Sequence, residues 1–222
     1  MSINEDMKEN WDRWAESDPY YAVITDPANK GGANDLFWQS GINVADRANY
    51  LASLCGLDMS CMTVAELGVG VGRVGAGLMN LCKEYTGIDV SSKMLDVCRH
   101  HHPNMKLQLV TEPFPEVDLF YSVITLQHCA PSEISILLDR MFRAAKKAVL
   151  FQLTDMPYDG VAPHQDDPYM PMYGVPIIKV IEDAVRHDFS TSLVIKGTDA
   201  GPDIDSYHYL FTRKNTLTCE HP

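Results

Sequence analysis

The stretch AELGVGVGRVG, residues 65–75, decides the fold that we expect for this chain of 222 residues. It follows the apolar run MTVAEL, residues 62–67, and holds one acidic residue, Glu66. Its four glycines are Gly68, Gly70, Gly72 and Gly75. Glycines after a strand allow positive φ and a close approach to the backbone. A helix that follows them offers free N–H groups and the positive end of its dipole. The stretch therefore predicts a strand, a tight glycine turn and a helix that begins near Val74.

Short apolar runs alternate with amphipathic stretches from about residue 62, which is typical of an α/β sheet fold. After the first strand, we expect further strands at 84–90, 106–110, 117–125, 147–153, 191–197 and 206–214. The expected helices are 74–82, one after Ser91 and Ser92, one with Ser132 as its N-cap, and one opened by Pro176. The short turn before the seventh strand predicts that the last two strands pair antiparallel.

Only TEPFPE, residues 111–116, separates the third strand from the fourth. Six residues with two prolines are too few for a crossover helix. If the strand order is 3-2-1-4, this link must span roughly 14 Å, and six extended residues reach roughly 20 Å. We therefore expect a bare loop where such folds usually have a helix.

Residues 1–60 stand apart from this alternation and hold most of the large aromatic side chains. These are Trp11, Trp14, Tyr20, Tyr21, Phe37 and Trp38. A helix near 43–55 leads into the first strand. The segment lacks enough apolar residues for a core of its own, so we predict a lid (1–60) over a Rossmann-like domain (61–216).

The composition disfavours several classes of partner. The net charge is −12 and no Lys/Arg cluster stands out, whereas proteins that bind nucleic acid usually present a basic face. No apolar run is long enough to span a bilayer, and the polar amino terminus has no signal-peptide pattern. Six scattered cysteines without C-x-x-C pairs indicate reduced thiols. We expect a cytoplasmic protein without nucleic-acid or membrane partners. The sequence carries no signal for its oligomeric state.

The glycine stretch contains a dinucleotide fingerprint, G-x-G-x-x-G, at Gly70, Gly72 and Gly75. Asp89 follows at the end of the second strand, about 20 residues on, where an acidic residue accepts ribose hydroxyls. A strand before the loop and a helix after it favour an adenosine-type cofactor over an empty turn. An oxidoreductase that uses NAD or NADP is one hypothesis.

Three stretches together point to another cofactor: VAELGVGVGRVG, YTGIDVSSKML and VDLFYSVITLQHC. They resemble the successive motifs of class I S-adenosylmethionine (SAM)-dependent methyltransferases, over about residues 60–154. The opening NWDRWAESDPYYAVITDP is similar to the lid of small-molecule members. The resemblance implies a doubly wound, mostly parallel seven-stranded sheet of order 3-2-1-4-5-7-6, with the last strand antiparallel. It also implies SAM as the cofactor.

The resemblance assigns cofactor contacts residue by residue. Gly68, Gly70 and Gly72 would form the loop. Glu66 would lie by the methionine amino group and Asp89 by the ribose. The adenine would lie among Val90, Met94, Thr111 and Glu112, and the methionine moiety near Ser122 and Val123.

Two further residues carry open alternatives. Tyr21, like Tyr20, either closes over the cofactor or acceptor or packs within the lid. Arg73 either pairs with the methionine carboxylate or is an exposed residue of the first helical turn.

Methyl transfer from a sulfonium needs mainly positioning of the acceptor, with a general base where the acceptor carries a proton. His128, in TLQHC after the fourth strand, is our candidate base, because its intrinsic pKa suits proton transfer near neutral pH. The alternative is a histidine that shapes the loop.

The connection 154–174 is a candidate wall for the acceptor. Its polar and aromatic residues are Asp155, Tyr158, His164, Asp166, Asp167, Tyr169 and Tyr173. HQDD within it does not provide a credible ligand set, so we expect no metal. The run HHH, residues 100–102, ends a helix, and we interpret it as structural.

The sequence thus predicts a SAM-dependent methyltransferase that acts on a small molecule. The alternatives are the NAD(P)-dependent oxidoreductase and a SAM-binding protein without turnover.

Overall fold

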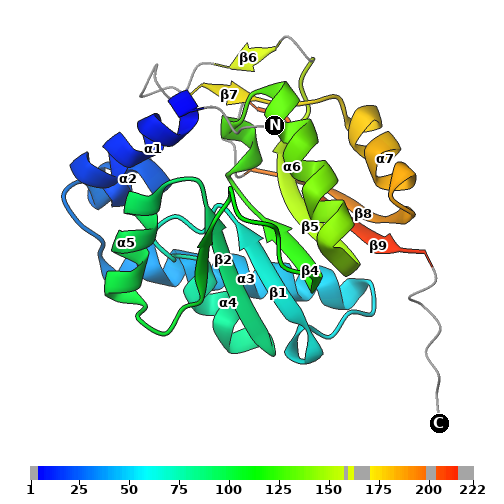
Figure 1. The fold of residues 1–222 in the computed structure, drawn as a ribbon, viewed down its shortest axis with the longest axis horizontal. Helices are drawn as coiled ribbons and strands as arrows, with labels where there is room; N and C mark the ends of the chain where they lie inside the picture. Colours follow the sequence, from blue (N-terminus) through cyan, green and yellow to red (C-terminus); the bar gives the residue numbers. More distant parts are fainter. Residues whose placement is uncertain (1–4, 158–159, 163–170, 199–203, 215–222) are drawn as a thin grey trace. The chain divides into compact units, whose positions relative to one another are not determined.

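A computed structural model describes residues 5–157, 160–162, 171–198 and 204–214. It divides into two compact units, residues 1–113 and 114–222. Figure 1 shows the helices and strands of each along the chain.

The first unit holds three parallel strands: β1 (Thr63–Leu67), β2 (Glu84–Asp89) and β3 (Leu107–Leu109). β2 pairs with both neighbours, with Leu67 opposite Ile88 and Asp89 opposite Leu109. β1 and β2 are almost wholly buried, as expected of strands covered on both faces. Their carboxyl ends lead into α4 (Gly75–Leu81) and α5 (Ser92–His101). Ser91 caps α5, since its Oγ accepts a hydrogen bond from the Met94 amide at 3.0 Å.

Between residue 5 and β1 lie three helices and two 3-10 turns. They are α1 (Glu5–Ser17), α2 (Pro19–Val23), η1 (Pro27–Asn29), α3 (Asp35–Leu54) and η2 (Met59–Cys61). α3 begins well before the predicted start at 43, because Asn34 caps it by accepting from the Phe37 amide at 2.9 Å.

α3 packs closely on α4 and the glycine loop through small residues. A Cβ on Gly41 would lie 2.0 Å from the Arg73 carbonyl oxygen, and one on Gly77 would lie 2.6 Å from Ala45 Cβ. Real Cβ atoms do not approach backbone so closely, so glycine is required at Gly41. The residues before β1 therefore pack directly on the glycine loop.

The described residues of the second unit form four longer strands and two helices. The strands are β4 (Val117–Ser122), β5 (Ala145–Thr154), β8 (Phe189–Gly197) and β9 (Ser206–Arg213). β4 and β5 pair parallel, whereas β9 pairs antiparallel with both β5 and β8. The helices are α6 (Pro131–Ala144) and α7 (Ile177–Arg186), with the 3-10 turn η3 (Leu126–His128) before α6.

The strand order of the seven-stranded sheet is β3-β2-β1-β4-β5-β9-β8. This is the predicted order 3-2-1-4-5-7-6, so the fold class and the antiparallel last strand are confirmed. The link 110–116 contains no helix, also as predicted. A short second pair, β6 (Val161–Ala162) and β7 (Met172–Tyr173), lies in the connection that the sequence left without structure.

Two further predicted boundaries were wrong for local reasons. β4 ends at Ser122 rather than at 125, because Ile124 has φ of 53° and turns the chain into η3. The N-cap of α6 is Ala130 rather than Ser132. Pro131 occupies the first turn, and Glu133 accepts a hydrogen bond from the Ala130 amide at 3.0 Å.

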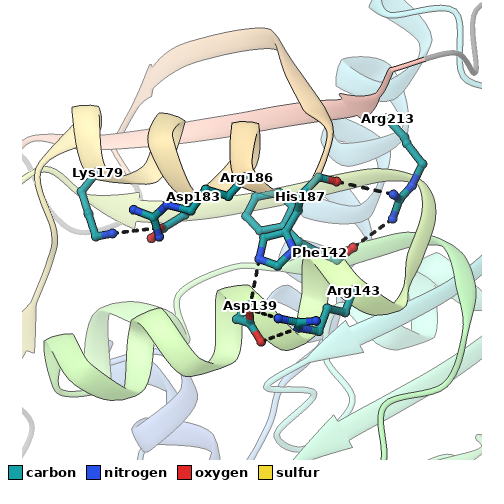
Figure 2. A network of polar contacts seen from close by, with 8 residues as sticks. All are labelled: Asp139, Phe142, Arg143, Lys179, Asp183, Arg186, His187 and Arg213. Carbon is teal, nitrogen blue, oxygen red and sulfur yellow. Dashed lines mark hydrogen bonds and ion pairs between the residues drawn. The ribbon is translucent and has the colours of Figure 1, made fainter.

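A polar network ties the ends of α6, α7 and β9 together (Figure 2). Asp139 accepts two hydrogen bonds from Arg143, and His187 Nε2 lies 3.1 Å from Asp139 Oδ1. The Arg213 guanidinium donates to the carbonyls of Ala145 at 2.8 Å and Phe142 at 3.2 Å. Arg213 thus satisfies carbonyls at the carboxyl end of α6, which have no partner within a helix.

Candidate cofactor site

The glycine loop turns sharply at the carboxyl end of β1. Gly68, Gly70 and Gly72 have φ of 82°, 53° and 87°, a region that residues with a Cβ rarely adopt. The Gly68 amide donates to the Ile88 carbonyl at 2.7 Å, which holds the loop against β2. Gly75 differs, because its restriction is steric: a Cβ there would lie 2.4 Å from the Tyr85 hydroxyl.

Asp89 connects the loop to the start of α5. Its Oδ2 accepts from the Gly70 amide at 2.8 Å and its Oδ1 accepts from the Ser91 amide at 2.9 Å. The side chain is buried, and burial raises the pKa of Asp89 while its backbone hydrogen bonds oppose that rise. The predicted proximity of Asp89 to the glycines is therefore present in the structure.

Glu66 is only 2% exposed, and it receives a short hydrogen bond from the Tyr85 hydroxyl to its Oε2. Burial raises the pKa of Glu66 to about 7, against the opposing effects of the Tyr85 hydrogen bond and the Arg73 charge. Tyr85 was not anticipated from the sequence. A tyrosine in a strand that the sequence predicts for the centre of the sheet was the available signal, because a buried tyrosine hydroxyl usually finds a partner.

Arg73 is 4% exposed, so the interpretation of an exposed first-turn arginine was wrong. Its guanidinium donates to Ser40 Oγ at 3.0 Å and lies 5.9 Å from the Phe37 ring centroid. α3 covers this residue, and the sequence prediction of α3 began too late to show it.

The lid contacts the loop and the start of α5. Val23 Cγ2 would be 3.3 Å from a Cβ on Gly70. The Ser91 hydroxyl donates to Asp12 Oδ1 at 2.6 Å, and Lys93 forms an ion pair with Glu16. Residues of α1 and α2 thus lie against the glycine loop and the start of α5, where the cofactor is predicted to bind.

The two lid tyrosines have different surroundings. The Tyr20 hydroxyl hydrogen-bonds to His101 Nε2 at 2.6 Å, and its ring contacts Phe37 and Trp38. The Tyr21 ring lies 6.3 Å from the Trp14 ring, with Lys30 Nζ 4.7 Å from its centroid. Both therefore make packing contacts within the lid.

The four residues expected around adenine differ in solvent exposure. Met94 is buried in an apolar cluster with Ala22, Phe37 and Val71, and Val90 is half-buried. Thr111 and Glu112 are exposed, and Glu112 Oε1 accepts from the Leu109 amide at 2.9 Å.

His101 and His102 of the HHH run pack against the Trp38 ring, with ring centroids 5.1 and 5.3 Å away. Burial, followed by the charge of a neighbouring histidine, lowers the pKa of each. These contacts agree with the structural interpretation of the run.

Ser122, Val123 and His128 belong to the second unit. Ser122 and Val123 are buried at the end of β4, and His128 ends η3. His128 Nε2 lies 3.4 Å from Gln127 Nε2. Gln127 in turn contacts Gln152 of β5. Neither glutamine was predicted from the sequence as a site residue. Gln152 stands alone among apolar residues in KAVLFQL, and this was a usable signal, because buried polar groups need partners.

The proposed acceptor wall is only partly within the described residues. Tyr158, His164, Asp166, Asp167 and Tyr169 lie outside them. Asp155 Oδ1 accepts from the Ile177 amide at 2.9 Å at the start of α7, and Tyr173 lies in β7.

Two kinds of feature are absent from the described residues. No group of three or more His, Cys, Asp or Glu side chains there is placed to hold a metal ion. None of the helices in that part of the chain is both long and apolar enough to cross a membrane.

The strand order and the glycine loop are those of a Rossmann-like fold. Residues 65–151 match the family described as Methyltransferase domain. The chain therefore contains a methyltransferase domain and has the class I methyltransferase fold, as the resemblance implied. No curated protein matches the sequence.

Solved structures with this fold include magnesium protoporphyrin IX methyltransferase from Synechocystis PCC 6803. Its complex with S-adenosylhomocysteine (SAH) aligns with a TM-score of 0.69 and 13% identity over 93% of this chain and 97% of that one. Its complex with SAM aligns with a TM-score of 0.68 and 15% identity, over 96% and 99%. A putative RNA methyltransferase from Pyrococcus horikoshii aligns with a TM-score of 0.52 and 18% identity, over 77% and 84%.

Proposed function

We propose that this chain binds SAM at the loop 65–75 and transfers its methyl group to a small-molecule acceptor. The observation that carries the proposal is the set of contacts around Asp89, which joins the glycine loop to the amino end of α5. Two neighbouring structures hold SAM or SAH, and the matched family is a methyltransferase domain. Both support SAM over a nicotinamide cofactor.

The residues present fit an adenosine cofactor. Three glycines with positive φ add no side chains of their own to the loop, and Asp89 lies beside it. Each carboxylate oxygen has a second lone pair, so Asp89 keeps acceptor capacity for ribose hydroxyls while it holds Gly70 and Ser91. When bound, SAM supplies an activated methyl group on its sulfonium.

Glu66 and Arg73 suit the methionine end of that cofactor. The buried Glu66 carboxyl has a pKa of about 7, and an ammonium group beside it would favour its ionised form. Arg73 is held by Ser40, and its charge reaches Glu66. We propose that the pair recognises the amino group and the carboxylate of the methionine moiety.

The acceptor is proposed to be a small molecule on two grounds. The net charge of −12 opposes binding to a phosphate backbone, whose affinity comes largely from Lys and Arg contacts. The contacts of α1 and α2 with the loop and α5 suit a lid, which restricts access to the cofactor. The RNA methyltransferase among the neighbours makes RNA the second candidate.

Thermal unfolding with ligands tests the proposal. We expect SAH to raise the melting temperature of the wild-type chain and of Asp46→Ala, an exposed control on α3. Asp89→Ala should remove the shift, because the ribose acceptor and the Gly70 contact are both lost. A shift with NAD or NADP but none with SAH would support the oxidoreductase instead.

A further inference from the structure

A buried acid and a buried tyrosine share a hydrogen bond between two neighbouring strands. Glu66 of β1 is 2% exposed and Tyr85 of β2 is 8% exposed. The Tyr85 hydroxyl donates to Glu66 Oε2. Within the described part of the chain, that hydroxyl has no other hydrogen-bond partner. The contact therefore fixes one oxygen of the Glu66 carboxyl.

The glycine stretch leaves room for this pair at Gly75, the first residue of α4. A Cβ there would lie 2.4 Å from the Tyr85 hydroxyl oxygen and 3.1 Å from Glu66 Oε2. Burying a hydroxyl and a carboxyl is costly unless they are hydrogen-bonded, and apolar β-branched residues would fill a buried strand without that cost. The pair therefore needs a reason beyond packing.

The direction of the hydrogen bond decides where Glu66 carries its proton. Burial and the neighbouring Glu66 raise the pKa of Tyr85, so the hydroxyl keeps its hydrogen and donates it to Oε2. When Glu66 is neutral, its own hydrogen is therefore on Oε1. An ammonium group has three donors and no acceptor. It can bond to Oε1 only after the hydrogen there has left.

Several groups of the first unit act on the charge of Glu66. Burial has the largest effect and raises its pKa to about 7, helped by the charge of Asp89 and opposed by the Tyr85 hydrogen bond and the Arg73 charge. The Cys98 thiol of α5 is also coupled to Glu66, but burial raises the pKa of that thiol to about 12, so it stays neutral. Below pH 7 the protein thus holds Glu66 mainly in its neutral form.

We propose that Tyr85 is a positioning residue that holds the Glu66 carboxyl by Oε2 and leaves Oε1 for the ammonium group of the cofactor, whose binding displaces the Oε1 hydrogen to solvent. This inference rests on the proposed function. A neutral acid and an ammonium become a carboxylate–ammonium ion pair, and one proton leaves for water. The ammonium keeps its three hydrogens, and no covalent bond of the cofactor changes. The Tyr85 hydroxyl stabilises the ion pair, because hydrogen bonds to an ionised acceptor are the stronger ones.

Calorimetric titration with SAH in buffers of different ionisation enthalpy counts the protons released on binding. At about pH 6 the amino group of SAH is protonated, and we expect the wild-type protein to release about one proton per SAH. Release should fall to half near pH 7, where half of the free protein has already ionised Glu66. Glu66→Gln should lose this release. The wild type should also lose it with the SAH analogue that lacks the amino group.

Tyr85→Phe tests the positioning role. It should weaken SAH binding about tenfold, as expected for the loss of one hydrogen bond to a charged group. Binding of the analogue without the amino group should hardly change, because that ligand does not need the ionised carboxylate. The pH of half-release should rise above 7, since the hydrogen bond that lowers the pKa of Glu66 is gone. Tyr50→Phe, the same change at an exposed site on α3, should alter none of these values.

Amide ¹H–¹⁵N spectra show whether each variant is folded. If Tyr85→Phe does not fold, fluorotyrosine at position 85 gives the opposite test, because its more acidic hydroxyl is a stronger donor and should lower the pH of half-release. The inference is overturned if the wild type binds SAH without releasing a proton. It is also overturned if Tyr85→Phe weakens SAH and the analogue by the same factor. Failure of the wild type to bind SAH at any pH refutes the proposed function itself, and this inference with it.

Discussion

At the scale of the residue, Glu66 is an acid whose ionisation is coupled to folding. Burial raises its pKa to about 7 from an ordinary value of 4.5. The folded protein therefore holds this proton at pH values where the unfolded chain has released it. Stability from this group is present below about pH 4.5 and is lost as the pH rises toward 7.

We expect this loss to disappear in Glu66→Gln. Between pH 4.5 and 7, the free energy of unfolding of the wild type should fall relative to that of the variant, by up to about 3 kcal/mol. Urea unfolding of both proteins at a series of pH values measures the difference in free energy of unfolding. The contributions of the other titrating groups are the same in both proteins and cancel in this difference. A difference that is constant across this range would contradict the account.

Asp89 and Glu66 were predicted from sequence as members of one site, and the structure places both in the same compact unit. Their partners were not predicted. Tyr85 reaches Glu66, and Asp12 reaches Ser91 beside Asp89, only through side-chain contacts across strands and helices. Spacing along the sequence predicts which residues share an edge of the sheet, but it does not predict which hydroxyl lies within 3 Å of a carboxylate.

At the scale of the element, the packing of α3 depends on Gly41. A Cβ there would lie 2.0 Å from the Arg73 carbonyl oxygen and 2.7 Å from its Cγ. We expect Gly41→Ala to lower the free energy of unfolding by about 1–3 kcal/mol, the usual cost of overpacking, because the backbone must move.

Gly32→Ala is the matched control for that substitution. A Cβ on Gly32 meets no atom within 4 Å, and no positive φ is recorded there, so stability should change by less than about 1 kcal/mol. Chemical denaturation measures both variants. Equal effects of the two substitutions would show that α3 does not depend on the close approach at Gly41.

Arg213 has a comparable role in the second unit. It is half-buried and donates to the carbonyls of Phe142 and Ala145. Arg213→Met should cost about 1.5–3 kcal/mol, the range for hydrogen bonds to charged groups. Arg99→Met, which removes an exposed ion pair with Asp96, should cost no more than about 0.5 kcal/mol. A small effect at Arg213 would mean that water replaces these bonds.

The elements with a strong sequence pattern were predicted well, and the misses have physical causes. β5 contains the continuous apolar run AVLF, so this strand was evident. The end of β4 was set by the backbone of Ile124, which no apolar pattern records. The early start of α3 depends on Asn34, which precedes the apolar stripe from which the helix was predicted.

At the scale of the whole molecule, charge separates the two acceptor classes. A net charge of −12 should keep the chain from binding RNA through its backbone. We expect no binding of a labelled transfer RNA in fluorescence anisotropy at physiological ionic strength. Saturable binding there would favour the RNA candidate over a small molecule.

We propose that the loop 65–75 holds SAM rather than a nicotinamide dinucleotide. Isothermal titration of the wild-type chain with SAH, and separately with NAD and NADP, distinguishes the two cofactors. We expect one-site binding of SAH, loss of that binding in Asp89→Ala, and no heat from either dinucleotide. Binding of NAD or NADP in the absence of SAH binding would contradict it.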